Sequence, residues 1–339
     1  MKKTTFLTAA VAALALGTTV ASAGTLDDVK ANGELRCIVS TGLPGFAYTD
    51  ANGVYQGFDA DFCRATAAAV LGDASKVKYI PATGKTRFTL LNSGEGDVIW
   101  RNTTWTFVRD VDVKTTFVGV NYYDGQGFMV PKALGVKSAK DLDGATVCIQ
   151  TGTTTELNLA DYFRTNKISY EPVPIEDSEE ARKNYLAGRC DVYTTDASGL
   201  AASRAVFDNP ADHVILPEII SKEPLGPVVR HGDDNWSDVV RWVLNATLAA
   251  EELGITQANV AELAKGTNNP EINRMLGSEG NLGAMLGLQK DWVAKAISSV
   301  GNYSEIFERH IGPKTTIGLE RGLNALWTDG GLQYTPPFR

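Results

Sequence analysis

Three short segments of the sequence combine side chains that could bind both charges of a zwitterion. Arg109 lies about one helical turn after a loop, and its guanidinium could hold a carboxylate through two parallel hydrogen bonds. Asp196 follows a β-branched run and could accept an amine. Residues 153–156 (TTTE) open a predicted helix, whose free N–H groups and dipole could receive a carboxylate. Together these groups match the head group of an amino acid.

Each of these residues also has a structural interpretation. Residues 153–156 form a capping box, in which the first Thr caps the helix and the Glu reaches back. Asp196 could be a helix N-cap and Arg109 a solvated helix residue. Aromatic residues near these loops, Phe46 among them, are more often core residues than ligand platforms. The combination still favours a binding site, because a buried zwitterion needs a partner for each of its charges.

These segments are expected at the ends of strands in two similar α/β units. Short apolar runs alternate with helical periodicity, which predicts parallel strands covered by helices. The first unit is predicted as strand 35–39, helix 59–71, strand 77–80, helix 86–92 and strand 97–100. The second unit is predicted as strand 146–150, helix 153–165, strand 170–173, helix 179–186 and strand 191–195. The candidate loops follow the carboxyl ends of these strands, where open α/β sheets bind ligands.

Two extended runs separate the units from the rest of the chain. Residues 127–131 (GFMVP) and 224–229 (PLGPVV) are predicted as hinge strands. Residues 236–309 are predicted as mostly helical, with glycine-rich breaks. We expect this region to return to the first lobe. Residues 24–128 and 227–339 would then form one discontinuous lobe, and residues 129–226 the other.

The first 23 residues have the features of a secretory signal peptide. A basic start at Lys2 and Lys3 precedes an apolar stretch, residues 6–20, and an A-x-A cleavage site ending at Ala23. The apolar stretch is short for a membrane span, which needs about 20 such residues. No Cys stands directly after the cleavage site, as it would in a lipoprotein. We therefore expect an exported mature chain that is free in solution.

Four cysteines favour disulfides, because export places the chain in an oxidising compartment. Cys37 and Cys63 lie in the first predicted unit, and Cys148 and Cys190 in the second. Three pairings are possible; if the units are separate lobes, the pairs are Cys37–Cys63 and Cys148–Cys190. In a sheet of order 2-1-3 the first and third strands are neighbours, which favours the second of these pairs. Each bridge would stabilise its lobe by about 3 to 4 kcal/mol in the chain-entropy model.

Charge and composition argue against several classes of function. The formal net charge is −8, or −10 without Lys2 and Lys3, and no basic block could follow a phosphate backbone, so nucleic acid is not an expected partner. No CxxC motif occurs and the three histidines are scattered, so neither a metal nor a cofactor is predicted. The candidate loops lack paired carboxylates, a Ser-His-Asp set and a glycine-rich phosphate loop. We therefore expect a binding protein and no enzyme.

Four motifs resemble those of a known family, the polar amino-acid-binding proteins of ABC uptake systems (solute-binding family 3). GFDAD at residues 57–61 is similar to the family's G-F-D-x-D helix opening, and TFVR at 106–109 is similar to its T-x-x-R segment. GTT at 152–154 resembles its G-T-T loop, and AGRCD at 187–191, followed by Asp196, resembles its A-G-x-x-D strand and binding Asp. The resemblance spans nearly the whole mature chain. It implies the two-lobed type II periplasmic-binding fold, an α/β architecture in which each lobe is a doubly wound, mostly parallel sheet and two hinge strands join the lobes.

The resemblance also implies ligand contacts for six residues of this chain. These are Arg109, Thr104 and Thr154 on the α-carboxylate, Asp196 on the α-amine, Thr153 as a supporting contact and Phe46 as an aromatic near the cleft.

Further features bear on which amino acids bind. Chain length and the stretch WRNTTW at residues 100–105 are most similar to the general L-amino-acid-binding branch. Relatives that bind basic amino acids have an acidic residue in the first loop and an aromatic residue soon after, whereas this chain has Ser40 and Leu43. Arg101 stands where those relatives have a small hydroxyl residue. The expected ligands are therefore L-amino acids of broad, polar or acidic character, with Arg101 directed at the ligand side chain.

The implied mechanism is conformational trapping in the periplasm. Ligand binds one lobe of the open form, the other lobe closes about the hinge strands, and the closed monomer docks on a membrane permease of an ABC importer. Two alternatives stay open at this point. One is a periplasmic enzyme on the same fold, such as a dehydratase, and the other is a ligand sensor for a signalling receptor.

Overall fold

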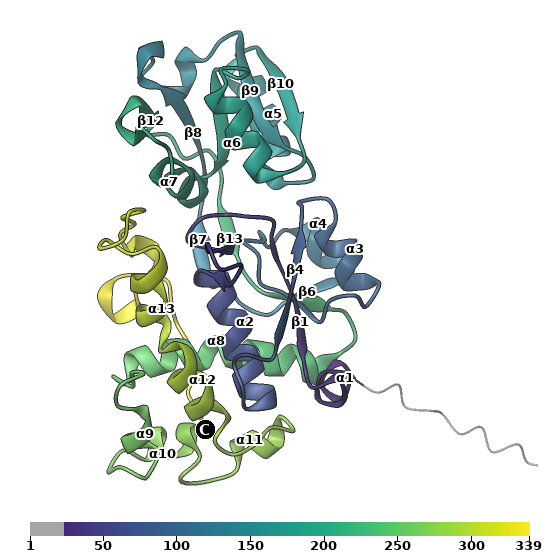
Figure 1. Ribbon diagram of the computed structural model, residues 1–339, viewed down its shortest axis with the longest axis vertical. Helices are drawn as coiled ribbons and strands as arrows, with labels where there is room; N and C mark the ends of the chain where they lie inside the picture. Colours follow the sequence, from purple (N-terminus) through teal and green to yellow (C-terminus); the bar gives the residue numbers. More distant parts are fainter. Residues whose placement is uncertain (1–23) are drawn as a thin grey trace, which may run out of the picture.

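The first of two five-stranded sheets is formed mainly by the N-terminal part of the chain (Figure 1). Its strands are β1 (Leu35–Ser40), β4 (Val77–Ala82), β5 (Val98–Ile99), β6 (Thr115–Phe117) and β14 (Val228–Arg230). In space their order is β4-β1-β5-β14-β6, with the first three parallel and β14 antiparallel to β5. Alternate residues of β1 enter different clusters: Cys37 and Val39 pack with α2 (Phe58–Leu71), and Ile38 packs with α3 (Arg87–Asn92). Helices therefore cover both faces of this sheet.

The second sheet repeats this plan. Its strands are β8 (Gln126–Pro131), β9 (Ala145–Gln150), β10 (Tyr170–Ile175), β11 (Val192–Asp196) and β12 (His213–Ile215). Their order is β10-β9-β11-β8-β12, again with three parallel strands followed by an antiparallel one. Helices α5 (Thr154–Asn166), α6 (Ser178–Leu186) and α7 (Ala197–Ala205) cover it. The two sheets with their helices are called the first lobe and the second lobe below, and they form the doubly wound α/β fold that the sequence predicts.

The structure describes residues 24–339, and the expected signal peptide, residues 1–23, lies outside them. Short elements complete the two lobes. They are α1 (Thr25–Asn32), β2 (Tyr48–Thr49), β3 (Tyr55–Gln56), α4 (Phe107–Val111), η1 (Lys132–Leu134), η2 (Ala139–Asp141) and η3 (Pro210–Asp212). Within the described part of the chain, no helix is long and apolar enough to cross a membrane.

Two short strands connect the lobes. Strands β7 (Tyr122–Asp124) and β13 (Glu223–Leu225) form an antiparallel pair in which Asp124 lies opposite Glu223. The sequence predicts the first hinge strand at residues 127–131, and this prediction is wrong, because these residues belong to β8 inside the second sheet. A buried antiparallel strand and a hinge strand both appear as short apolar runs, so the pattern does not separate them. The second expected run, residues 224–229, contains the end of β13 and the start of β14.

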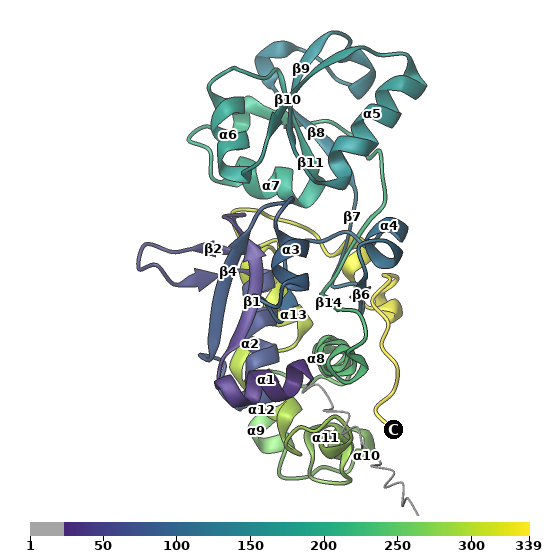
Figure 2. The same cartoon turned by 90° about the vertical axis from the view of Figure 1, so that its right-hand side faces the viewer.

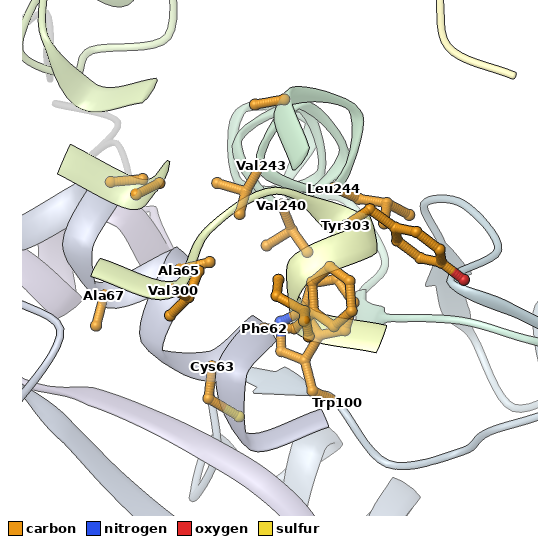
Figure 3. Packing of buried hydrophobic residues seen from close by; sticks show 14 of the residues in the cluster. Phe62, Cys63, Ala65, Ala67, Trp100, Val240, Val243, Leu244, Val300 and Tyr303 are labelled. Atoms are coloured by element: carbon orange, nitrogen blue, oxygen red, sulfur yellow. The ribbon is translucent and has the colours of Figure 1, made fainter. Parts of the chain in front are cut away.

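The C-terminal third of the chain thickens the first lobe. It forms α8 (Asp234–Glu252), α9 (Val260–Leu263), α10 (Pro270–Leu276), α11 (Leu282–Met285), α12 (Trp292–Val300), α13 (Tyr303–His310), η4 (Gly322–Asn324) and η5 (Trp327–Asp329). Figure 3 shows how these helices pack against α2: Phe62 of α2 lies among Val240 of α8, Tyr303 of α13 and Trp100. Phe62 stacks on the Trp100 ring with centroids 4.6 Å apart. The single core that results joins the start and the end of the chain.

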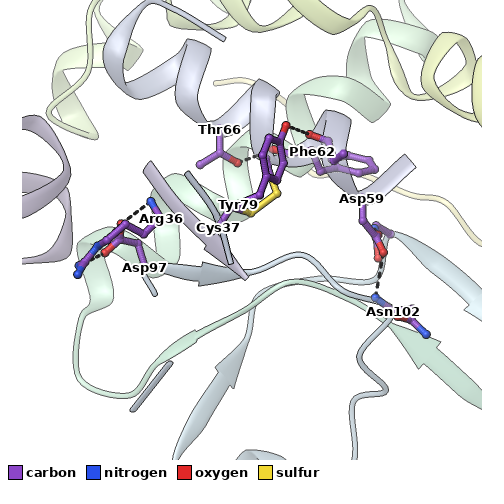
Figure 4. The surroundings of a disulfide bond; sticks show 11 residues. Arg36, Cys37, Asp59, Phe62, Thr66, Tyr79, Asp97 and Asn102 are labelled. Carbon is purple, nitrogen blue, oxygen red and sulfur yellow. Dashed lines mark hydrogen bonds and ion pairs between the residues drawn. A yellow bond between two sulfur atoms is a disulfide. The ribbon is translucent and has the colours of Figure 1, made fainter. Parts of the chain in front are cut away.

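Each lobe contains one disulfide. Cys37 of β1 is bonded to Cys63 of α2, and Cys148 of β9 is bonded to Cys190 just before β11 (Figure 4 shows the surroundings of the first bond). The Cα atoms of the two pairs are 6.0 and 5.5 Å apart. These are the pairs expected if the two units are separate lobes. Neither bond crosses between the lobes, so neither restricts their relative motion.

Candidate functional site

A small polar cavity lies between the lobes at the carboxyl ends of their central strands. It is lined by Arg87, Arg101, Asn102 and Thr104 from the first lobe, and by Gln150, Thr153, Thr154, Thr155, Thr195 and Asp196 from the second lobe. These residues follow or end strands β4, β5, β9 and β11, so the sheet topology brings them to one place.

The lobes contact each other around this cavity, and the structure therefore represents a closed form. Thr83 of the first lobe donates a hydrogen bond to Glu176 of the second at 3.1 Å. Arg182 of the second lobe donates to the carbonyl of Gly42 in the first, also at 3.1 Å. None of these four residues lines the cavity.

At one point of the interlobe contact, backbone packs against backbone. A Cβ atom added to Gly84 would lie 2.8 Å from the carbonyl oxygen of Thr151 and 2.9 Å from Cγ2 of Thr153. A Cβ on Gly152 would similarly lie 3.0 Å from the backbone nitrogen of Lys85. Only residues without side chains allow the lobes to approach this closely.

The first-lobe side of the site holds three buried guanidinium groups. Arg101 donates to the carbonyl of Ala82 at 2.9 Å, and Arg109 donates to the carbonyl of Thr104 at 2.9 Å. Arg87 donates to the Thr103 hydroxyl at 3.2 Å, and its Nε has no partner within residues 24–339. None of the three forms a salt bridge with a carboxylate of this part of the chain. Unpaired buried cations are costly, so this cluster favours an anionic ligand group.

Burial and mutual repulsion weaken proton binding by these guanidiniums. Burial lowers the pKa of Arg101 to about 10, with a further contribution from the Arg109 charge. Burial likewise lowers the pKa of Arg109 to about 10. For Arg87, burial and then the charges of Arg109 and Arg101 hold the pKa well below its ordinary value. All three groups therefore gain stability when an anion approaches.

The second-lobe side presents a single carboxylate, Asp196. This residue ends β11 and precedes α7, but its side chain makes no capping hydrogen bond, so the N-cap interpretation does not account for it. Its partner in the structure is the Asn102 amide, at a long 3.5 Å. Burial, and then the nearby carboxylates of Asp124 and Glu223, raise the pKa of Asp196 well above its ordinary value. A cation at this position would stabilise the ionised form of Asp196 and lower its pKa again.

The start of α5 also differs from the expected capping box. Thr153 occupies the N-cap position, but its hydroxyl donates to the Gln150 carbonyl at 2.6 Å and does not cap the helix. Glu156 accepts from the Gly152 N–H at 3.3 Å. The Thr154 hydroxyl donates to Glu223 at 2.9 Å. The first N–H groups of α5 thus lack a cap from Thr153, which leaves this helix end suited to a carboxylate.

Asp59 positions the loop that carries Arg101 and Asn102. It accepts hydrogen bonds from the Asn102 N–H at 3.1 Å and from the Asn121 amide at 3.3 Å (Figure 4 shows the first). Asn102 has a left-handed backbone with φ of 23°, which Asn tolerates better than most residues. Burial raises the pKa of Asp59 to about 7. The second acidic position of the GFDAD motif, Asp61, instead pairs with His310 of α13 at 2.6 Å.

The structure brings most of the expected ligand residues together. Those that line the cavity are Arg101, Thr104, Thr153, Thr154 and Asp196. Arg109 lies directly behind this wall, bonded to the Thr104 carbonyl. Phe46 is placed elsewhere: it is 1% exposed and packs against the rings of Phe58 and Tyr122 in the first-lobe core.

Five lining residues were not named individually as ligand contacts from the sequence. They are Arg87, Asn102, Gln150, Thr155 and Thr195. Arg87 carried a usable signal, because it lies in the first turn of α3, soon after the carboxyl end of β4. The rule that selected the other loops applies to this strand as well.

Comparison with known proteins gives consistent matches over the whole chain. Residues 35–259 match the bacterial extracellular solute-binding proteins, family 3. The chain is 64% identical over 340 residues to the glutamate/glutamine/aspartate/asparagine-binding protein BztA of Rhodobacter capsulatus, covering 100% of both chains. It is 58% identical to the general L-amino acid-binding periplasmic protein AapJ of Rhizobium johnstonii, over 99% of this chain and 100% of the relative.

One solved structure is similar over nearly the full length. It is an ABC transporter/periplasmic binding protein from Brucella ovis with glutathione bound. It matches with a TM-score of 0.91 and 58% sequence identity, covering 94% of this chain and 100% of that one.

Proposed function

The chain belongs to family 3 of the bacterial extracellular solute-binding proteins, and we propose that it holds polar and acidic L-amino acids between its lobes for uptake by an ABC importer. The observation that carries this proposal is the distribution of charge across the cavity. Unpaired guanidiniums lie on the first-lobe side and Asp196 lies on the second-lobe side. An α-amino acid presents a carboxylate to one side and an ammonium to the other.

In the proposed complex the α-carboxylate lies against Thr104 and the start of α5. Arg109, which is hydrogen-bonded to the Thr104 carbonyl, supplies its positive charge from behind Thr104. The Thr154 hydroxyl is occupied by Glu223, so the N–H of Thr154 is the group that this residue offers to the ligand. Thr153 supports the same helix end. Asp196 accepts the ligand ammonium, which replaces the long contact with Asn102.

The ligand side chain is proposed to face Arg101 and Arg87. Two guanidiniums beyond the one assigned to the α-carboxylate favour a second anionic or polar group on the ligand. Glutamate and aspartate carry that group as a carboxylate, and glutamine and asparagine carry it as an amide. BztA is named for these four amino acids, which supports the same range here.

Transport follows from the closed form. We propose that residues 1–23 direct export and are removed near Ala23, and that the mature chain acts as a periplasmic monomer. Closure about β7 and β13 would bury the ligand, and the closed protein would deliver it to a membrane permease. Relatives such as BztA and AapJ are binding proteins by name, which supports binding without catalysis.

The decisive experiment is calorimetry on unfolded and refolded, ligand-free protein against all common L-amino acids, with glutathione included because the Brucella ovis protein contains it. We expect the tightest binding for glutamate, aspartate, glutamine and asparagine. Failure of every amino acid to bind would refute the proposal. Mass spectrometry of the recovered ligand separates binding from catalysis, since an enzyme such as a dehydratase would return a changed molecule.

A further inference from the structure

The C-terminal segment, residues 311–339, contacts the hinge and not the ligand cavity. All residues that line the cavity lie between positions 87 and 196, and the family match ends at residue 259. Figure 2 shows the C-terminal segment, in yellow, passing beside hinge strand β7. Neither ligand binding nor the family's shared fold therefore accounts for this position.

Asn324 of the C-terminal segment pairs with β7 as a short third strand would. Its Oδ1 accepts from the Tyr123 N–H at 2.7 Å, and its Nδ2 donates to the Tyr123 carbonyl at 3.1 Å. Tyr123 lies opposite Pro224 of β13, which has no N–H to offer. One buried carboxamide thus satisfies both peptide groups of a hinge residue.

Asn324 is itself fixed to the first lobe. Its carbonyl accepts from Arg321 Nε at 3.0 Å and from Nη2 at 2.9 Å. Arg321 forms a salt bridge with Glu251 of α8 at 3.0 Å, and its guanidinium lies 5.0 Å from the ring centroid of Tyr303 in α13. The turn that carries Asn324 therefore moves with the first lobe.

One end of the hinge-strand pair is fixed to the second lobe by two buried carboxylates. Asp124 of β7 accepts from the hydroxyl of Ser198 at the start of α7. Glu223 of β13 accepts from Thr154 at 2.9 Å and from Asn158 at 2.7 Å, both in α5. Hydrogen bonds to a buried carboxylate are among the stronger ones, so Asp124 and Glu223, at one end of the strand pair, move with the second lobe. Tyr122 and Leu225, at the other end, are buried in the first-lobe core.

The bend between the lobes then lies within this strand pair, and on β7 it lies between Tyr122 and Asp124. From a turn that moves with the first lobe, Asn324 holds both peptide groups of Tyr123, the residue at this bend. Rotation of the lobes apart would pull the two hydrogen bonds out of line.

We propose that Asn324 is a latch on the hinge, which stabilises the closed form and so sets how long a bound ligand is retained. The part of this inference that concerns retention rests on the proposed function. The latch itself is a property of the hinge and is measurable without ligand.

The test compares Asn324→Ala with a matched control, Asn269→Ala. Asn269 also binds two backbone N–H groups, at 2.9 and 3.4 Å, but it caps α10 at the end of the first lobe away from the hinge (Figure 1). Dissociation of glutamate is measured by stopped flow, and the ligand-free radius of gyration by small-angle scattering. Asn324→Ala should release glutamate about five- to tenfold faster, because one or two net hydrogen bonds are lost from the closed form.

A second variant separates the latch from simple loss of side-chain volume. Asn324→Asp keeps the acceptor for the Tyr123 N–H but turns an oxygen toward the Tyr123 carbonyl. It should release glutamate at least as fast as Asn324→Ala and should enlarge the ligand-free protein equally. Asn269→Ala should match the parent in both measurements.

Other outcomes overturn the inference. The latch is wrong if both Asn324 variants match the parent, or if Asn269→Ala accelerates release by the same factor, which would indicate general loss of stability. If the parent protein binds no amino acid, the proposed function fails and scattering alone decides: the latch then stands only if the Asn324 variants are more expanded than the parent and Asn269→Ala is not.

Discussion

The two sides of the ligand cavity bury charge in different ways. The first lobe contributes three guanidiniums held by carbonyl and hydroxyl oxygens, and the second lobe contributes one carboxylate and an uncapped helix start. Direct contact between the opposite charges is weak, since Asp196 reaches across only to Asn102 at 3.5 Å. The lobes therefore gain little electrostatic energy from each other alone. A zwitterion supplies the missing partner for each side, so ligand and closure stabilise one another.

The largest effect is expected from removing the negative side. Asp196→Asn should weaken binding of glutamate by about 100- to 1,000-fold, because the ligand ammonium would be buried without an anion. Titration calorimetry measures this change. The control is Asp191→Asn just before the other end of β11, where the carboxylate binds Thr146 and not the cavity. Equal losses in both variants would contradict the assignment.

The next largest effect concerns the extra positive charge on the first-lobe side. Arg87→Ala should lower affinity for glutamate about tenfold more than affinity for glutamine, because a carboxylate gains more than an amide from a guanidinium. The quantity measured is the ratio of the two dissociation constants. An unchanged ratio would show that Arg87 does not face the ligand side chain. The same measurement on Arg101→Ala tests whether Arg101 faces that side chain, as the sequence predicts.

A smaller effect on ligand affinity is expected at Gly84, where the backbones of the two lobes are in contact. Gly84→Ala should weaken ligand binding about tenfold, because the new Cβ meets the Thr151 carbonyl only when the lobes are closed. Its backbone φ is not in the left-handed region, so the ligand-free free energy of unfolding should stay unchanged. A drop in that free energy with no loss of affinity would place the clash within one lobe.

The smallest effect is a pH dependence of affinity. Burial and neighbouring carboxylates raise the pKa of Asp196, so the ligand-free protein retains a proton there to higher pH. The ligand ammonium favours the ionised form, and binding should release that proton. Affinity should therefore rise with pH until ligand-free Asp196 is ionised, by at most about tenfold per pH unit. Calorimetry in buffers of different ionisation enthalpy detects the released proton, and Asp196→Asn should abolish it.

Sequence patterns predicted the ends of strands better than the direction of the side chains there. Asp196 was found because strand ends converge at one edge of a parallel sheet, whereas Arg101 and Thr104 were assigned from the resemblance to a known family. Phe46 lies at such a loop as well, but its ring turns inward against Phe58. Loop position alone does not decide between cavity and core for an aromatic residue, because both environments remove apolar surface from water.

Contacts between residues far apart in the sequence could not be predicted either. The C-terminal third was expected from the sequence to be mostly helical and to return to the first lobe, and its helices share the core of that lobe. The contact of Asn324 with Tyr123 comes from a single polar residue in a 3₁₀ turn, 201 positions away in sequence. No periodic signal marks such a residue. The hinge itself was misplaced for a related reason, because residues 127–131 differ from a hinge strand only in their neighbours.

The second sheet is built from one continuous stretch whose ends lie side by side. Its strands run from Gln126 to Ile215, and the strands at its two ends, β7 and β13, are hydrogen-bonded neighbours. The stretch has its own core and its own disulfide. Segments with adjacent ends and independent cores tolerate insertion and exchange. Residues 125–222 therefore form a natural unit for recombination. Exchange of this segment would replace the second-lobe side of the cavity, with its carboxylate, and leave the guanidiniums of the first-lobe side in place.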